Sequence, residues 1–205
     1  MMRVSRRMVI ATLALAPAGC SGLLGGGGAP TALYTLTAFN FPPDGAPRKL
    51  SILIDKPTST DALDTTRIAL RHNQLSFNYF ADSAWTDPAP MMIQSLLVES
   101  LQRSGRVAAV SRNTLAIRGD LELRIEVRHF EAEYQGDIDI PTVRIEFGLM
   151  LVRVVDRTIV ATQTVTASAK PARNDVPAVV TAFDEALHAA IRDTLNWTLA
   201  NAGAR

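Results

Sequence analysis

The sequence predicts an α+β domain of two layers, in which two main helices pack on one face of a mostly antiparallel or mixed sheet. Three observations lead to this prediction. Several short segments alternate between apolar and polar residues or are continuously apolar, as β-strands are. Two longer segments repeat apolar residues every three or four positions, as helices do. The order is strands, helix, strands, helix, with no internal repeat and no sign of a second domain.

The first half of this domain contains four predicted strands, over residues 32–38, 50–55, 67–71 and 74–80. The first is rich in β-branched and aromatic residues. The second is almost entirely apolar, which predicts burial on both faces. A polar connector over 58–66 separates it from the other two, which we expect to form a hairpin with Asn73 in the turn.

A helix is predicted over residues 88–104. Asp87 would cap its first turn with a carboxylate, and Pro88 fits the first helical position because that position needs no N–H donor. Apolar residues follow at helical spacing, and Gly105 suits the left-handed conformation that often ends a helix.

The second half of the domain contains four further predicted strands, over residues 107–110, 121–128, 143–151 and 158–169. The alternation in 121–128 predicts one aliphatic face on the core and one charged face in water. It breaks near Met150, which indicates a bulge or an end buried on both faces. A tight turn at Asp156-Arg157 would join the last two strands. From Pro177 to about Leu199 the spacing predicts a long amphipathic helix.

The N-terminal segment has the plan of an export signal, with Arg3, Arg6 and Arg7 before an apolar run over 8–19. The run is 12 residues long, whereas a membrane-spanning helix needs about 20. The small residues before Cys20, the only cysteine, resemble a lipobox, although Pro17 stands where such signals usually have Leu. An ordinary signal peptide followed by a buried thiol is the alternative.

We therefore divide the chain into a lipoprotein signal peptide (1–19), a lipidated Cys20 with a glycine-rich tether (20–31) and one domain (32–202). The four consecutive glycines at 25–28 favour a flexible tether. Removing residues 1–19 leaves 18 basic and 20 acidic side chains, a net charge of −2. Such a balance gives no basic field for nucleic acid. Both the general secretory and the twin-arginine export routes remain open.

The search for catalytic and metal-binding patterns is negative. His72, His129 and His188 lack the close spacing of a metal pair, and no nucleophile elbow, phosphate-binding loop or dinucleotide fingerprint is found. The acids between 122 and 139 are interpreted as a solvated strand face, and His188 as a surface residue. We predict no enzyme activity, no cofactor and no metal site.

One ordered set of short motifs stands out. It consists of Leu63-Asp64, Arg67-Ile68, Arg71, Tyr79, Trp85 with Pro88, and a helix closed by Ser104-Gly105. Together with the opening strand at 32–36 and the lipobox, this order resembles the ABC-type transport auxiliary lipoprotein family, which includes the lipoprotein component of paraquat-inducible systems. The resemblance covers essentially the whole mature chain.

The resemblance implies an accessory, non-ATPase subunit of an envelope transport system. Such systems contain a mammalian-cell-entry domain protein, a permease and an ATPase, and move phospholipid or other hydrophobic substrates between inner and outer membranes. Family members associate as homo-oligomeric rings and are generally anchored to the outer membrane, facing the periplasm.

Five residues of the motif set are candidate interface residues. Tyr79 and Trp85 either anchor a contact with a partner or fill the space between the hairpin and the first helix. Asp64, Arg67 and Arg71 either fix the loop by ion pairs or face a neighbouring subunit. A docking subunit is the leading function, a lipid carrier with its own apolar pocket is the alternative, and a periplasmic hydrolase ranks last.

Overall fold

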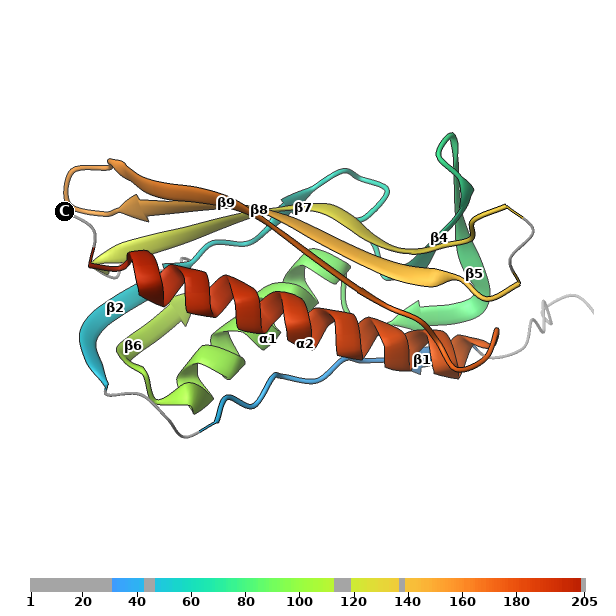
Figure 1. Ribbon diagram of the computed structural model, residues 1–205, viewed down its shortest axis with the longest axis horizontal. Helices are drawn as coiled ribbons and strands as arrows, with labels where there is room; N and C mark the ends of the chain where they lie inside the picture. The colour runs from blue at the N-terminus through green and yellow to red at the C-terminus, as the bar shows by residue number, and fades with distance from the viewer. Residues whose placement is uncertain (1–30, 43–46, 113–118, 137–138, 204–205) are drawn as a thin grey trace, which may run out of the picture. The chain divides into compact units, whose positions relative to one another are not determined.

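The fold was analysed in a computed structural model that describes residues 31–42, 47–112, 119–136 and 139–203 (Figure 1). The chain from Thr31 onward forms one compact unit. Over the described ranges it contains two helices and a mixed sheet of nine strands, and both helices lie on the same face of that sheet. The predicted α+β class is confirmed.

The strands of the first half are β1 (Ala32–Tyr34), β2 (Arg48–Ile54), β3 (Thr58–Ser59), β4 (Arg67–Asn73) and β5 (Ser76–Trp85). Helix α1 (Ala89–Ser104) follows, and then come β6 (Val107–Arg112), β7 (Leu121–Glu133), β8 (Thr142–Arg153) and β9 (Ile159–Ala169). Helix α2 (Val176–Asn201) ends the domain. The prediction missed β3, which lies inside the expected connector, and it ended β5 too early.

Strand β7 is the central strand of the sheet. One of its edges pairs with β8 in an antiparallel ladder that extends from Leu121 to Glu133. Its other edge pairs in succession with β2, β3 and β4, all parallel to it. Strand β5 continues the sheet from β4 to β1, β6 flanks β2, and β9 flanks β8.

A bulge in β7 reverses which residues face the core. The register with β8 shifts between Val127 and His129, so that Arg128 is an extra residue. Before the bulge, alternate residues up to Val127 are buried in the core; after it, Phe130 and Ala132 take over that face. Glu131 and Glu133 consequently lie on the face away from the helices.

The two hairpins form as predicted. Asn73 Oδ1 accepts the backbone N–H groups of Leu75 and Ser76, each at 2.9 Å, which closes the turn between β4 and β5. In the β8–β9 hairpin the register shifts beside Val152, and Leu151 and Val152 are both buried. The break in alternation near Met150 is thus the end of β8 that is buried on both faces, and the extra residue of the bulge, Val160, lies on β9 rather than on β8.

The helix ends agree only in part with the prediction. The expected cap at Asp87 is wrong, because Pro88 occupies the N-cap of α1 with no side-chain hydrogen bond and Pro90 lies in the first turn. Gly105 ends α1 with a φ of 63°, as predicted. Helix α2 begins at Val176, one residue before Pro177, and Asp175 caps it by accepting the N–H of Ala178 at 2.8 Å.

Between sheet and helices lies one continuous apolar core. At its centre the ring of Trp85 on β5 meets Phe183 on α2 edge to face at 5.2 Å, and Phe130 on β7 lies 6.0 Å away. In the described part of the chain, neither helix combines the length and apolar composition needed to cross a membrane.

The segment after β1 crosses the helices as an extended strap, so the prediction of a strand up to residue 38 is wrong beyond Tyr34. Thr37 binds α2 through its backbone N–H, which donates to Asp184 at 2.7 Å, and its hydroxyl lies 2.9 Å from His188 Nε2. The backbone N–H of Phe39 donates to Ser100 Oγ on α1 at 2.9 Å. His188 is therefore half-buried and holds the strap.

Candidate functional site

The five candidate residues of the motif set occupy two environments. Trp85 is only 1% exposed and belongs to the core, where it packs between β7 and α2 and leaves no side-chain surface for a partner. Asp64, Arg67, Arg71 and Tyr79 lie near one another around the β4–β5 hairpin. The outer face of the sheet, which is the face opposite the helices, carries Arg67, Arg71 and Tyr79.

Arginine and aromatic side chains alternate along the outer face of this hairpin. The Arg67 guanidinium carbon lies 3.7 Å from the centre of the Tyr79 ring, and Arg71 lies 4.9 Å from the Phe77 ring. The two rings meet edge to face at 5.5 Å. Cation–π contacts of this kind fix the plane of a guanidinium while leaving its N–H groups accessible.

Asp64 and the Tyr79 hydroxyl fix the loop before β4. Asp64 pairs with Lys56 at 3.1 Å, and Tyr79 donates to the carbonyl oxygen of Ala62 at 3.1 Å. Asp64 thus makes an ion pair of the kind considered for it, here with Lys56.

A buried carboxylate next to the hairpin was missed by the sequence reading. The side chain of Glu131 is 0% exposed and accepts three donors: the backbone N–H of Phe130 at 2.6 Å, Arg71 Nε at 3.1 Å and, when that nitrogen is protonated, His129 Nδ1 at 2.6 Å. The alternation with arginines suggested a solvated face, which is wrong for Glu131. The bulge at Arg128 is the local feature that turns this residue towards β4.

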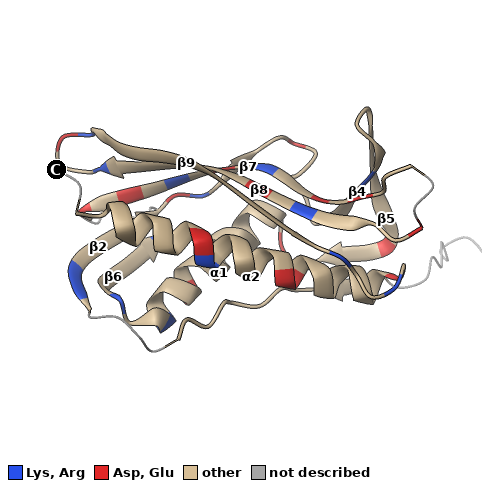
Figure 2. Ribbon diagram, in the orientation of Figure 1, with Lys and Arg blue, Asp and Glu red and all other residues tan. Residues whose placement is uncertain are grey.

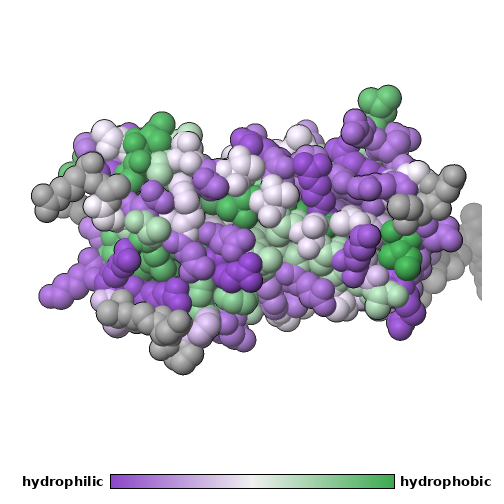
Figure 3. Space-filling model, viewed as in Figure 1, coloured by the Kyte–Doolittle hydropathy of each residue, from purple (hydrophilic) through white to green (hydrophobic). Residues whose placement is uncertain are grey.

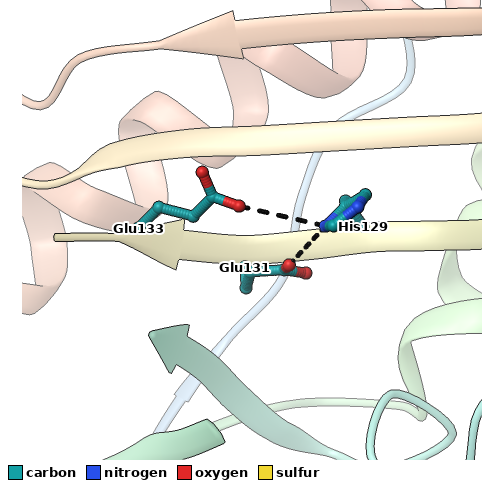
Figure 4. Close-up of side chains that lie close together, drawn as sticks. All are labelled: His129, Glu131 and Glu133. Atoms are coloured by element: carbon teal, nitrogen blue, oxygen red, sulfur yellow. Dashed lines mark hydrogen bonds and ion pairs between the residues drawn. The ribbon is translucent and has the colours of Figure 1, made fainter. Parts of the chain in front are cut away.

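Glu131 belongs to a cluster with His129 and Glu133 whose ligand atoms lie within 4.8 Å of one another (Figure 4). Three such groups could hold a metal ion by spacing alone. Two arginines already compensate these carboxylates, since Arg71 contacts Glu131 and Arg144 lies 3.5 Å from Glu133. Adjacent guanidinium groups oppose a divalent cation, so the cluster is better described as a structural charge network.

An open groove of about 740 Å³ lies on the outer face over β7, β8 and β9. Its floor includes Gly148, and the Arg128 guanidinium lies so close to this glycine that an added Cβ would come within 2.7 Å of it. Basic and acidic residues alternate along β7 (Figure 2). At the start of β7, burial by itself would raise the pKa of Glu122, but hydrogen bonds with Asp55 and Arg124 lower it below its usual value. The groove itself is lined by compensated charges, since Arg124 pairs with Asp55 at 3.4 Å and Arg128 with Glu126 at 2.8 Å.

Hydrophobic residues are scattered on the surface. Figure 3 shows small separated groups of them on a mainly polar face, one at the tip of the β4–β5 hairpin. That tip carries Leu75, which is fully exposed, and Leu33 on β1 is 66% exposed. The predicted lipidation residue, Cys20, lies outside the described residues.

Solved structures of other proteins share the fold of this chain. The crystal structure of protein XCC0632 from Xanthomonas campestris, of family DUF330, shares 29% identity with this chain at a TM-score of 0.76, covering 83% of this chain and 96% of that one. Hypothetical protein CT253 from Chlamydia trachomatis has a TM-score of 0.53 at 9% identity, over 77% of this chain and 100% of that one, which is a likeness of fold alone.

Sequence comparison gives the family. An uncharacterised protein of Bradyrhizobium diazoefficiens, bll6063, is 30% identical over 180 residues, which are 85% of this chain and 47% of that protein. The chain thus spans about half the length of this curated relative. The family described as "ABC-type transport auxiliary lipoprotein component" matches residues 34–193, from β1 into α2. The chain therefore belongs to the ABC-type transport auxiliary lipoprotein family.

Proposed function

We propose that this protein is a lipid-anchored, periplasmic docking subunit of an ABC transport system that contains a mammalian-cell-entry domain protein, a permease and an ATPase. The system would move phospholipid or another hydrophobic substrate between the inner and outer membranes. The subunit would be held at the outer membrane by acylated Cys20, would associate with further copies of itself and would catalyse no reaction.

The observation that carries this proposal is the match of the family over residues 34–193, which includes nearly all of the folded unit. Its membership of a lipoprotein family agrees with the lipobox-like sequence before Cys20. The charged clusters around Glu131 and Arg128 support a non-enzymatic role, because each ionised group there is compensated by a neighbour rather than set beside a nucleophile.

The structure gives less support to the alternative of a lipid carrier. The space between the sheet and the helices is filled by core side chains such as Trp85, Phe130 and Phe183. The groove on the outer face is bordered by Lys56, Arg124, Glu126 and other polar groups. Pockets for hydrophobic ligands are lined mainly by apolar side chains.

The test is a pull-down from detergent extract with an affinity-tagged full-length chain. We expect the mammalian-cell-entry protein, the permease and the ATPase to be recovered together and identified by mass spectrometry. An unrelated lipoprotein with the same tag is the control for adhesion to detergent micelles. Recovery of tightly bound phospholipid without any transport component would instead favour the carrier.

A further inference from the structure

Arg67 on the outer face of β4 is an exposed cation whose geometry is fixed before any partner binds. Its guanidinium lies 3.7 Å above the Tyr79 ring. That ring is itself held by the hydrogen bond from its hydroxyl to Ala62 and by the edge-to-face contact with Phe77. A side chain that is ordered in advance loses less entropy on binding.

Arg67 also differs from its cationic neighbours, because no carboxylate of the described residues pairs with it. Arg71 pairs with Glu131 at 3.1 Å and Lys56 pairs with Asp64 at 3.1 Å. Among the residues that the structure describes, none places a carboxylate within 4.0 Å of the Arg67 guanidinium. One cation of the hairpin region is therefore stacked, exposed and available to an anion.

Apolar side chains lie beside Arg67 across the sheet. In the pairing of β1, β5 and β4, Leu33, Ala84 and Arg67 are neighbours in one row across the sheet. Leu33 is 66% exposed, and Phe77 is half-buried beside Tyr79. Aromatic residues and arginine at the centre of an apolar patch are the composition enriched at the energetic centres of protein interfaces.

We propose that the Arg67 surface, made of Leu33, Arg67, Phe77, Tyr79 and Ala84, docks a partner protein that presents an aspartate or glutamate to Arg67. This proposal rests on the proposed function, because the partner is a component of the same transport system. The fixed guanidinium would bind the carboxylate through two N–H groups, and the flanking apolar side chains would exclude water from the pair.

The charges favour a protein carboxylate over the phosphates of a membrane surface. Binding to an anionic lipid surface usually requires a cluster of basic residues. Here Arg67 acts singly, since Arg71 and Lys56 are compensated. The chain from Cys20 onward has a net charge of −2, so the protein as a whole is not attracted to anionic lipid.

The test compares the wild-type full-length chain with Arg67→Glu and Tyr79→Leu. The transport component recovered by the wild type is purified and titrated with each chain. We expect Arg67→Glu to weaken the affinity at least about tenfold. Tyr79→Leu, which removes the ring under the guanidinium, should weaken it less. Added salt should reduce the affinity of the wild type more than that of Arg67→Glu.

Lys49→Glu is the matched control, because Lys49 is an exposed cation on β2 and its reversal changes the net charge equally. Thermal melting of each variant checks the fold, and Arg67→Gln replaces Arg67→Glu if the latter is destabilised. Equal affinity of wild type and Arg67→Glu overturns the docking surface alone. Failure of the wild type to recover any transport component overturns the proposed function and this surface with it.

Two further outcomes would also contradict the proposal. If Arg67→Glu leaves the partner affinity unchanged but lowers the oligomeric mass measured by light scattering, the surface belongs to a contact between copies of this chain. If it instead abolishes binding to phosphatidylglycerol vesicles with partner affinity unchanged, the anion is a lipid phosphate.

Discussion

At the scale of single residues, Glu131 carries a charged side chain that is fully buried, so its charge must be stabilised by neighbouring donors. A carboxylate removed from water needs several donors, and Glu131 has the Phe130 N–H, His129 and Arg71 around it. The Arg71 side chain is 27% exposed, so it connects this buried charge to the surface of the hairpin. Glu131 thereby joins β7 to β4 through side chains as well as through the backbone ladder.

We expect Glu131→Gln to lower the free energy of unfolding by about 1–3 kcal/mol, because the change removes the negative charge that compensates Arg71 in a site closed to water. Urea denaturation at neutral pH would measure the loss. Glu133→Gln is the matched control, because the Glu133 side chain is 21% exposed and its partners His129 and Arg144 lie 3.9 and 3.5 Å away. This substitution should lower the free energy of unfolding by less than about 1 kcal/mol. Similar losses in both variants would contradict the special role of Glu131.

At the scale of elements, α2 depends on Asp175 for its first turn. Asp175 accepts the Ala178 N–H and pairs with Arg173 at 2.8 Å. The pair with Arg173 and the Ala178 hydrogen bond hold the pKa of Asp175 below its usual value. A lowered pKa means that the stabilisation is fully present above the unfolded-state pKa, which is about 3.9, and is lost as the pH falls from there through the folded-state pKa.

We therefore expect Asp175→Ala to lower the Tm by about 2–4 °C at pH 7, since the helix loses its cap. The difference from the wild type should shrink as the pH falls below about 4, when the carboxylate becomes protonated. Thermal melting from pH 3 to pH 7 would measure both effects. Asp175→Asn keeps the capping oxygen but loses the charge, so its Tm at pH 7 should lie between those of the wild type and Asp175→Ala. A deficit independent of pH would speak against the ionised carboxylate.

Elements defined by local sequence were predictable, and pairings between distant segments were not. The alternation of β7 and the helical spacing around Phe183 identify a strand and a helix, because each pattern involves only residues that are close together in the sequence. The helix start at Asp87 failed because Pro88 and Pro90 both suit a first turn, and the sequence does not say which one is used. The burial of Glu131 depends on one extra residue, Arg128, that alternation alone does not reveal.

The candidate site divides in the same way. Motif order placed Arg67, Arg71 and Tyr79 in one region, and the structure brings them onto one face. The motif could not separate Trp85, which is a core residue, because an aromatic side chain serves equally well in a core and in an interface.

At the scale of the whole molecule, the question is what holds the chain at a membrane. The described helices do not span one. We expect Cys20→Ala to leave the domain folded and to release it into the soluble periplasmic fraction, because acyl chains on Cys20 would attach it to the membrane. Cell fractionation with a high-salt wash, followed by immunoblotting, would measure the release.

Ser21→Ala is the neighbouring control and should remain in the membrane fraction. A Cys20→Ala chain that stays membrane-bound after the high-salt wash would contradict the lipid anchor. Circular dichroism of the released chain would establish that the loss of the anchor leaves the fold intact.

The position of β7 also sets the order in which the sheet can be completed. Its antiparallel neighbours β8 and β9 follow it directly in the chain, whereas β2, β3 and β4 precede it by some 50 to 70 residues of sequence that must close as loops. In a chain delivered N-terminus first, these three strands emerge early and have no central partner until residues 121–133 arrive. The first half of the protein therefore remains without its final pairing until more than half of the chain has been synthesised, and during this interval it is most exposed to chaperones and proteases.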